Sequence, residues 1–451
     1  MNLHGPVRPS DAAGVGDAVV AISLDSWPAG LVAPTTHAIS VVRPKSREAP
    51  QPVSSRFVRT LIHPERKAHV SQVRFSSDGA RLFTAGSSSG IAQFWDVATG
   101  KEIARVNTGT GRRDFELPDD WSIVYVPQEN RTMARIKNGD EQDVRVDYDG
   151  IILVFDVVKG EPRPPLKPPG GHGVPRAFVS PDGRKLVAVE QPSGLRTEHK
   201  KSRTVLWDTR TATAKPLGDG DGQSAAFSPD SRLLALCQND LREPMAGVLK
   251  LLDAAGTELA ELATVKREVV SLPKFSPDGT RLVVQQSKNR VNQPAVLRVF
   301  DVQTRKELAA FQSDGDVAFA EYGFAPGGER IAATDFDNGR VRVWDVTTGK
   351  TVFDRLISRD VRFEHPAFFP DGRRLAVLGQ PKWNPAEFSP EPDPRELPQP
   401  RVYLFDVTKP TAEPEIIMCP YGWLGGLALS PDGKLLAVGG AGATHLFDLA
   451  R

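Results

Sequence analysis

The sequence predicts an all-β fold made of repeated four-stranded units, and three features support this prediction. A turn of the Ser-Pro-Asp-Gly type recurs along the chain, and an apolar or aromatic residue followed by Asp recurs between these turns. Glycine (39) and proline (38) are spread along the 451 residues instead of being gathered in one tract. Many short strands joined by turns rich in these residues are typical of all-β architectures.

The recurring turn has a chemical pattern that predicts a β-hairpin. Serine at the first position bonds back to the backbone, proline presets the φ angle of the second, and glycine suits the last. Alternating apolar residues flank it, as in Val73–Phe75 before the first turn and Arg81–Thr84 after it, and this alternation indicates strands. The turn occurs at Ser76–Gly79, Ser180–Gly183, Ser228–Ser231, Ser276–Gly279, Ala325–Gly328, Phe369–Gly372 and Ser430–Gly433.

The second recurring mark is an aspartate that closes a strand. An apolar or aromatic residue precedes it each time, as in Trp95-Asp96, and a second turn often follows, as in Val97–Lys101. Because these aspartates recur by repeat position, we interpret them as hydrogen-bonding turn residues, not as catalytic carboxylates. They are Asp96, Asp156, Asp208, Asp253, Asp301, Asp345, Asp406 and Asp448.

The two marks alternate in order from about residue 57 to residue 448, and over this stretch the chain resembles the WD40 repeat family. The resemblance implies a β-propeller with four strands per blade and Trp-Asp at the end of the third strand. The chain departs from the family pattern in ways that suggest a divergent, bacterial-type branch. The family's Gly-His pair occurs once, at Gly171-His172, with His69 in a comparable place in the first repeat. The family's Asp before the third strand is Ser89 in the first repeat and Asn338 in the sixth.

We expect eight blades, with seven as the alternative count. Eight closing aspartates accompany seven obvious turns, and the segment 115–124 supplies the missing turn, with Asp120 in the usual place of glycine. The last repeat ends without a fourth strand, and Phe57–Ile62 resembles one. We therefore predict that this N-terminal strand completes the last blade, which removes two open sheet edges.

The propeller is expected to span residues 51–451. Residues 1–50 form an N-terminal extension or a cap over one face. In a rival count, Val19–Ser23 and Ala38–Val42 belong to a decayed extra blade.

Insertions are confined to one position in the repeat. The distance from each closing aspartate to the next turn is nearly constant, whereas the distance from a turn to its own closing aspartate varies. The variable segments therefore lie between second and third strands, on the face that carries the links between blades, and variable loops on a rigid scaffold are a usual place for binding. They are Pro127–Gly150, Glu190–Arg203, Gln238–Gly247, Gln285–Pro294 and Gly379–Pro400.

The charges of three inserted loops suggest a recognition face. Those of repeats three and five lean basic, and that of repeat seven leans acidic (Glu387, Glu391, Asp393, Glu396). Two readings stay open: solvated charges on tolerated insertions, or a bipolar surface for a partner. The candidate partner-binding residues are Arg196, Lys200, Lys201, Arg203, Lys288, Arg290 and Trp383.

Composition narrows the choice of partner and compartment. Lys plus Arg (57) nearly equals Asp plus Glu (56), so no basic excess favours nucleic acid or an anionic membrane. We expect neither as a partner.

No apolar run is long enough to span a bilayer, and the N-terminus lacks the pattern of a secretory signal. Only Cys237 and Cys419 occur, so a disulfide framework is excluded. A cytoplasmic, monomeric propeller is expected.

Catalytic signatures are absent from the sequence. The eight histidines have no metal-ligand spacing, and no nucleophile elbow or phosphate-binding loop follows a strand. We expect no metal and no cofactor. The leading hypothesis is a non-catalytic scaffold that binds a protein or peptide partner. The alternatives are an enzyme or ligand sensor that uses the central channel, and a sensor domain separated from a larger regulatory protein.

Overall fold

The computed structural model describes residues 55–450 with gaps at 65–68, 87–88, 109–114, 139–140, 169–172, 192–201, 241–244, 289–292, 314–317, 336–338, 383–398 and 421–423. Only the backbone is described for 128–138, 141–149, 191 and 221–223. The described chain contains thirty-one strands and no helix. Residues 1–50, and with them the extension, the cap and the rival strands Val19–Ser23 and Ala38–Val42, lie outside this part.

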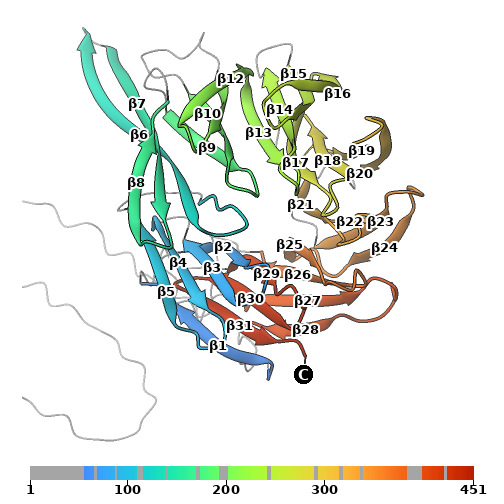
Figure 1. Cartoon of the computed structure of the whole chain (residues 1–451). Helices are drawn as coiled ribbons and strands as arrows, with labels where there is room; N and C mark the ends of the chain where they lie inside the picture. Colours follow the sequence, from blue (N-terminus) through green and yellow to red (C-terminus); the bar gives the residue numbers. More distant parts are fainter. Residues whose placement is uncertain are drawn as a thin grey trace, which may run out of the picture. The chain divides into compact units, whose positions relative to one another are not determined.

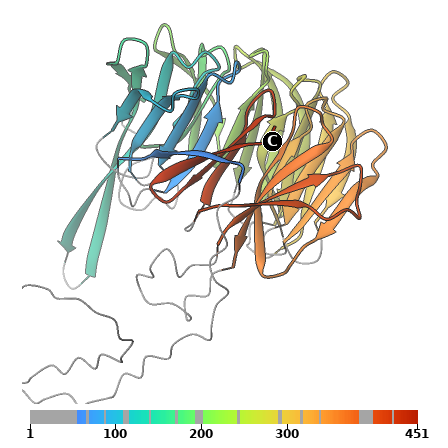
Figure 2. The ribbon, with the colours of Figure 1, turned by 90° about the horizontal axis from the view of Figure 1, so that it is seen from below.

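The strands form eight antiparallel sheets arranged around a central axis (Figures 1 and 2), a β-propeller with eight blades. Blade 1 contains β2 (Val70–Phe75), β3 (Arg81–Gly86), β4 (Ile91–Asp96) and β5 (Glu102–Asn107), and blade 2 contains β6 (Ile123–Asn138), β7 (Glu141–Asp156) and β8 (Glu161–Leu166). Blade 3 contains β9 (Gly173–Val179), β10 (Lys185–Gln191), β11 (Arg203–Asp208) and β12 (Thr213–Asp219), and blade 4 contains β13 (Asp221–Phe227), β14 (Leu233–Asp240), β15 (Ala246–Asp253) and β16 (Glu258–Lys266).

The second half of the ring repeats the arrangement. Blade 5 contains β17 (Val269–Phe275), β18 (Arg281–Ser287), β19 (Ala295–Asp301) and β20 (Glu307–Gln312), and blade 6 contains β21 (Phe319–Phe324), β22 (Arg330–Asp335), β23 (Arg340–Asp345) and β24 (Thr351–Leu356). Blade 7 contains β25 (Val361–Phe368), β26 (Arg374–Pro381), β27 (Arg401–Asp406) and β28 (Glu415–Met418), and blade 8 contains β29 (Leu424–Leu429), β30 (Leu435–Gly440), β31 (Ala443–Asp448) and β1 (Phe57–Ile62).

The predicted count of eight blades is confirmed. Seven sheets have four strands, and the sheet of blade 2 has three. In blade 2, residues 115–117 take the place of the missing inner strand. They pair with the sheet through one antiparallel bridge, between Glu116 and Tyr125.

The turn of blade 2 differs from the prediction by one residue. Trp121, not Asp120, takes the place of glycine: its N–H donates to the carbonyl of Pro118, and its φ is +56°. A left-handed tryptophan is unusual, but its ring is buried between the rings of Phe83 and Phe94, at centroid distances of 6.3 and 6.0 Å. Burial of this large side chain outweighs the conformational cost.

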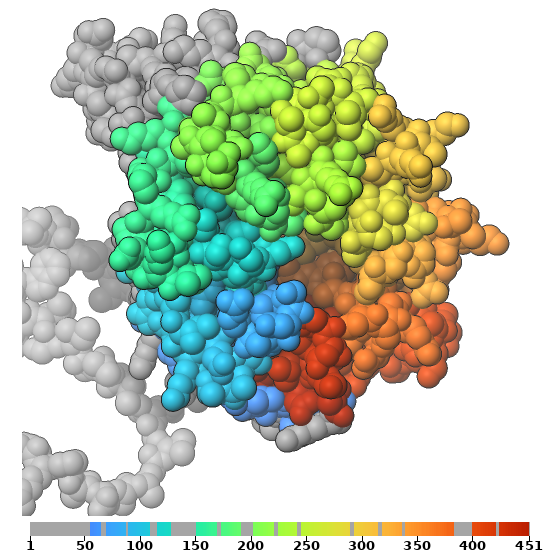
Figure 3. Space-filling view, in the orientation of Figure 1, coloured from blue at the N-terminus to red at the C-terminus, as the bar shows by residue number. Residues whose placement is uncertain are grey.

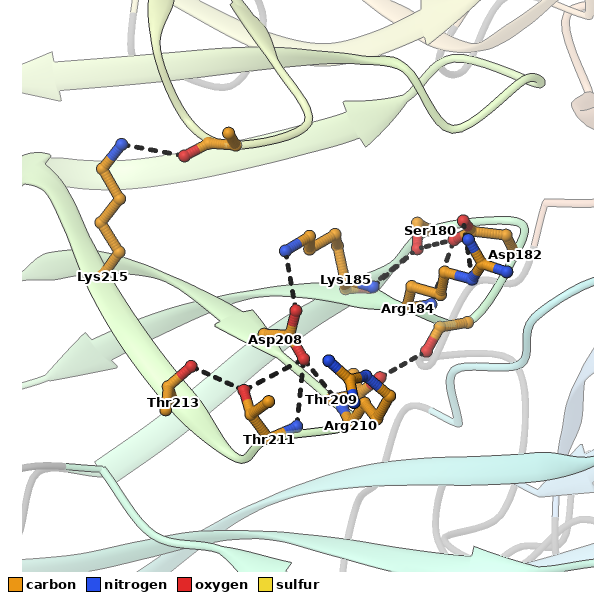
Figure 4. A network of polar contacts seen from close by, with 12 residues as sticks. Ser180, Asp182, Arg184, Lys185, Asp208, Thr209, Arg210, Thr211, Thr213 and Lys215 are labelled. Carbon is orange, nitrogen blue, oxygen red and sulfur yellow. Dashed lines mark hydrogen bonds and ion pairs between the residues drawn. The ribbon is translucent and has the colours of Figure 1, made fainter.

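The recurring turns have the chemistry that the sequence indicates (Figure 4). In blade 3, Ser180 Oγ donates to Asp182 Oδ1 at 2.7 Å and accepts the N–H of Lys185 at 2.9 Å. The closing aspartate, Asp208, accepts the ammonium of Lys185 at 3.0 Å and the N–H of Thr211 at 3.0 Å. These bonds, led by the one from Lys185, lower the pKa of Asp208 to about 2. Both aspartates are therefore parts of turns.

The N-terminal strand closes the ring, as predicted. β1 pairs antiparallel with β31, with Thr60 opposite His445 and Ile62 opposite Ala443. Leu61, 3% exposed, packs with Leu446 and with residues of β2 in the core between blades 8 and 1. The two ends of the described chain thus share one sheet.

Three side-chain amides, one on an inner strand (β2) and two on second strands (β14 and β26), cross blade boundaries, and each forms two hydrogen bonds with one residue of the next blade. Asn239 in blade 4 accepts the N–H of Val270 at 3.0 Å and donates to its carbonyl at 2.9 Å. Gln72 in blade 1 does the same with Phe115, at 3.0 and 3.4 Å. Gln380 in blade 7 accepts the N–H of Leu424 at 3.3 Å and also donates to its carbonyl. We call these three contacts the amide clamps.

One inserted segment is not a loop. The structure continues β6 and β7 as a paired ribbon through Pro127–Gly150, in unbroken register from Ile123–Asp156 to Asn138–Glu141. The loops predicted at Gln238–Gly247 and Gln285–Pro294 are shorter than expected, because their strands continue to Asp240 and Ser287 before the chain turns.

Removal of the closing strand should destroy the ring, whereas removal of the preceding residues should not. A chain lacking residues 1–50 keeps β1 and should melt in one cooperative transition. A chain lacking residues 1–63 loses Leu61 and leaves the edge of β31 open, so it should aggregate or melt at a much lower temperature. Equal melting of the two truncated chains in differential scanning calorimetry would contradict this role of β1.

Asn239→Leu should destabilise the propeller, because it leaves the buried N–H and C=O of Val270 without partners. Each unpaired buried group costs about 1–3 kcal/mol, so we expect a loss of about 2–4 kcal/mol in the free energy of unfolding. Urea titration followed by tryptophan fluorescence measures it. Gln303→Leu, which changes an exposed amide in a turn, is the matched control and should alter stability by about 0.5 kcal/mol or less.

Candidate functional site

The face that carries the inserted segments is the first candidate site. In each blade the second strand ends and the third begins on this face, whereas the Ser-Pro-Asp-Gly turns lie on the opposite face. Figure 2 shows the ribbon of β6 and β7 projecting away from the ring on the insertion side. We call this the loop-rich face.

Of the seven predicted partner-binding residues, the structure describes two. Arg203 is the first residue of β11, in blade 3, and Lys288 is exposed directly after β18, in blade 5. Blade 4 separates them, so the described structure does not bring them together. The others, Arg196, Lys200, Lys201, Arg290 and Trp383, lie outside the described residues.

Arg203 is held at the base of its loop by an ion pair. It lies opposite Glu190 in the register of β10 and β11, and its Nη2 and Nε are 2.6 and 3.1 Å from Glu190 Oε2. The Glu190 side chain has no exposed surface, whereas that of Arg203 is 31% exposed. A buried carboxylate requires such a partner, so the guanidinium of Arg203 is engaged by the framework.

Blade 6 has a related ion pair at the same end of the sheet. Asp335, at the end of β22, is 2.7 Å from Arg342 Nη2, and the two side chains are 1% and 10% exposed. Arg342 also donates to the carbonyl of Gln312 at 3.2 Å. Its guanidinium carbon lies 5.2 Å from the centre of the Trp344 ring. Sequence reasoning missed both ion pairs, because the partners become neighbours only through the strand register.

The central channel is the second candidate site. Figure 3 shows the hollow near the centre of one face, where the inner strands meet. On the inner strands β21 and β25, His365 Nδ1 is 3.0 Å from Glu321 Oε2, and the backbone N–H of His365 donates to the same oxygen at 2.9 Å. Lys274 Nζ donates to the carbonyl of Tyr322 at 2.8 Å. With Glu364 and His69 these residues form what we call the channel cluster.

The environment shifts the pKa values of the channel cluster in different directions. Burial acts to lower the pKa of His365, but the hydrogen bond and charge of Glu321, with the charge of Glu364, outweigh it and raise the pKa. Burial lowers the pKa of His69. Lys274 is open to the solvent of the channel, yet the protein atoms around it lower its pKa.

The polar atoms of the channel cluster bond mainly to one another and to the backbone. His365 φ is +53°, a left-handed conformation directly before Pro366, and the double contact with Glu321 stabilises this bulge in β25. Among the described residues, no group of three or more His, Cys, Asp or Glu side chains is arranged to hold a metal ion. The cluster is therefore a polar junction of inner strands.

The cysteines and tryptophans of the described chain have structural roles. Cys237 and Cys419 are fully buried free thiols, and burial raises the pKa of each to about 12, which makes them poor nucleophiles. Trp95, Trp207 and Trp344 are buried, and each packs with residues of two neighbouring blades.

In the first blade, the tryptophan before the closing aspartate and the serine before the third strand each form a side-chain hydrogen bond. Trp95 Nε1 donates to Thr84 at 2.9 Å, and Ser89 Oγ is 3.4 Å from the Nε2 of His63. The sequence comparison proposed His69 for this place, but His69 lies in the channel cluster and His63 contacts Ser89. In blade 3 an alanine replaces the threonine, and Trp207 Nε1 has no hydrogen-bond partner within the described structure.

Comparison with known proteins agrees with this geometry. A family model, the WD domain, G-beta repeat, matches residues 55–96. The crystal structure of the C-terminal WD40 domain of Sif2 superposes with a TM-score of 0.58 at 11% identity, over 87% of this chain and 98% of that chain. The chain thus has a β-propeller fold like that of WD40 domains, with one WD40 repeat matched at residues 55–96. No curated protein sequence matches it.

Two further solved structures are similar to this propeller at lower scores. The propeller domain of Myceliophteria thermophila Cps50 (Swd1) has a TM-score of 0.49 at 13% identity and covers 88% of this chain and 100% of its own. Kuenenia stuttgartiensis hydrazine synthase has a TM-score of 0.47 at 14% identity and covers 86% and 97%. With TM-scores below 0.5, neither similarity is evidence about the activity of this chain. The described ranges contain no helix with the length and hydrophobicity needed to cross a membrane.

Arg203→Ala should destabilise the propeller, because it leaves the carboxylate of Glu190 buried without its partner. The partial exposure of Arg203 moderates the cost, and we expect a loss of about 2–3 kcal/mol in the free energy of unfolding. Replacing both partners, as Glu190→Leu with Arg203→Met, should recover most of it. Chemical denaturation of the three variants measures this, and a neutral Arg203→Ala would show that the pair is not structural.

Proposed function

We propose that this propeller is a non-catalytic scaffold that binds a protein or peptide partner through its loop-rich face. The proposal depends mainly on where the repeats differ in length. One face has uniform hydrogen-bonded turns, and the other has all the inserted segments, including the ribbon of β6 and β7. WD40 propellers commonly act as protein-interaction scaffolds. Variable loops on a rigid framework fit that role.

The base of one inserted loop supports the proposal, because an ion pair fixes it. The Glu190–Arg203 pair joins the strands on both sides of the 192–201 segment, and the Asp335–Arg342 pair makes a similar link between β22 and β23, outside the inserted segments. A binding loop on such a base loses less conformational freedom when a partner binds. We assign Arg203 to this supporting role.

The charges of the loops support a bipolar surface. We propose that Arg196, Lys200, Lys201, Lys288 and Arg290 contact acidic groups of the partner. The acidic loop with Trp383 would contact a second, basic or apolar region. Complementary charge steers association, and an aromatic anchor adds affinity.

We also propose that residues 51–451 form the propeller, with residues 1–50 as a separate extension, and that the chain acts as a monomer in the cytoplasm. Two buried free thiols are compatible with a reducing compartment. Catalysis in the channel has less support, since the groups of the channel cluster are engaged by one another, by the backbone and, for Glu364, by Arg362 and Gln380.

Lys200→Ala with Lys201→Ala should reduce partner capture at least about fivefold, because two charge contacts are lost while the Glu190–Arg203 pair stays intact. Quantitative affinity capture from the native cell, with the tagged full chain, measures this. Lys101→Ala with Lys350→Ala, two exposed lysines in turns on the opposite face, is the charge-matched control. Equal capture by both double variants would contradict binding through the loop-rich face.

A further inference from the structure

The histidines of the described chain gather around blade 8, the blade made from both ends of that chain. His445 lies in β31. His63 follows β1, and its backbone N–H donates to the carbonyl of Gly442. His69 forms a bridge with Ala441. His365, from blade 7, bonds to the backbone of Gly425 in β29. Histidine is the side chain whose charge changes most readily between pH 5 and 8. Histidines at the closure of the ring can therefore make its stability depend on pH.

His445 lies inside the closing pair of strands. It is 9% exposed, and its Nδ1 is 3.0 Å from Thr60 Oγ1, on the facing strand β1. Its ring centre is 6.4 Å from that of Phe57. Burial alone lowers the pKa of His445 to about 4. No charged side chain contributes to this shift. Arg59, on the facing strand β1, acts on Asp96 of blade 1 instead.

His69 lies between blade 8 and blade 1. A Cβ atom at Gly425 would be 2.3 Å from His69 Cε1, so the imidazole touches the backbone of β29 directly. Burial lowers its pKa, the charge of Glu364 and a hydrogen bond to the backbone of Leu424 act in the opposite direction, and the charge of His365 adds to the lowering. At neutral pH both His445 and His69 are therefore neutral in the closed ring.

His365 responds to acid in the opposite way. Glu321 and Glu364 raise its pKa, and the charge of Lys274 acts on Glu321 from β17. Protonation therefore strengthens the ion pair between blades 6 and 7. The same positive charge opposes protonation of His69. Acid thus stabilises the contact between blades 6 and 7 and destabilises the contacts of blade 8 with β1 and with blade 1.

We propose that blade 8 is a proton-sensitive latch: acidification weakens the pairing of β1 with β31 and the contact of His69 with β29, while the other blades stay folded. The sign follows from linkage. A histidine whose pKa is lowered in the folded state contributes stability above its unfolded value of 6.5, and this contribution is lost as the pH falls from there towards the folded value. The turn aspartates, with pKa values below 3.8, stay ionised at pH 5. The histidines therefore account for most of the change in side-chain charge between pH 7 and pH 5.

Hydrogen exchange followed by mass spectrometry, on the full chain at pH 7 and pH 5 and corrected for the intrinsic rate at each pH, tests this latch. With folded and open pKa values of about 4 and 6.5, the opening equilibrium of β1 and β31 should rise about 25-fold at pH 5. Protection of β14 in blade 4 should stay the same. A uniform change in all blades, or no change in β1, would overturn the proposal without any variant.

His445→Gln supplies the second measurement, because it keeps a hydrogen-bonding group opposite Thr60 but does not titrate. The variant should lose most of the pH dependence in β1 and β31 while β14 stays as in the parent chain. If His445→Gln fails to fold, His69→Gln should remove the part of the pH dependence that appears in β29. An unchanged pH response in the folded variants would contradict the latch.

Discussion

The ring of sheets in this protein depends on the pairing of β1 with β31, because its last blade takes strands from both ends of the propeller chain. Blades 1 to 7 are each built from one continuous stretch of chain, so local turns are sufficient to form them. The pairing of Thr60 with His445 joins residues 385 positions apart. Without it, two sheet edges would be open and Leu61 would be missing from the core between blades 8 and 1.

The other blade boundaries are held by apolar packing and by the amide clamps. Gln72, Asn239 and Gln380 occur in blades 1, 4 and 7, and each gives the next inner strand the two hydrogen bonds that a neighbouring strand would supply. Asn239 and Gln380 lie near the ends of β14 and β26, where two of the inserted segments begin. These segments therefore vary in length beyond residues that tie neighbouring blades together, and variable loops on such a framework suit a binding scaffold.

Buried charges in this propeller are used for assembly. Glu190 with Arg203 and Asp335 with Arg342 hold strand ends, and Glu321 with His365 joins two inner strands. Where a buried group has no counter-charge, as at His445, the ring tolerates it only in the neutral form. The same burial that makes the closure stable above neutral pH makes it the part of the ring that responds to protons.

The sequence by itself determined the all-β class, the repeat, the count of eight and the closing strand Phe57–Ile62, because these depend on local turn chemistry and on alternation along single strands. It misplaced the turn of blade 2, because burial of Trp121 between two aromatic rings is a non-local effect. It also took Pro127–Gly150 for a loop, although Asn138-Gly139 is a hairpin signal in that segment. The loop-rich face follows from repeat spacing, but the engagement of Arg203 by Glu190 and the gathering of histidines around blade 8 do not. Only the tertiary structure decided these, since register and ring closure bring together residues that no sequence pattern relates.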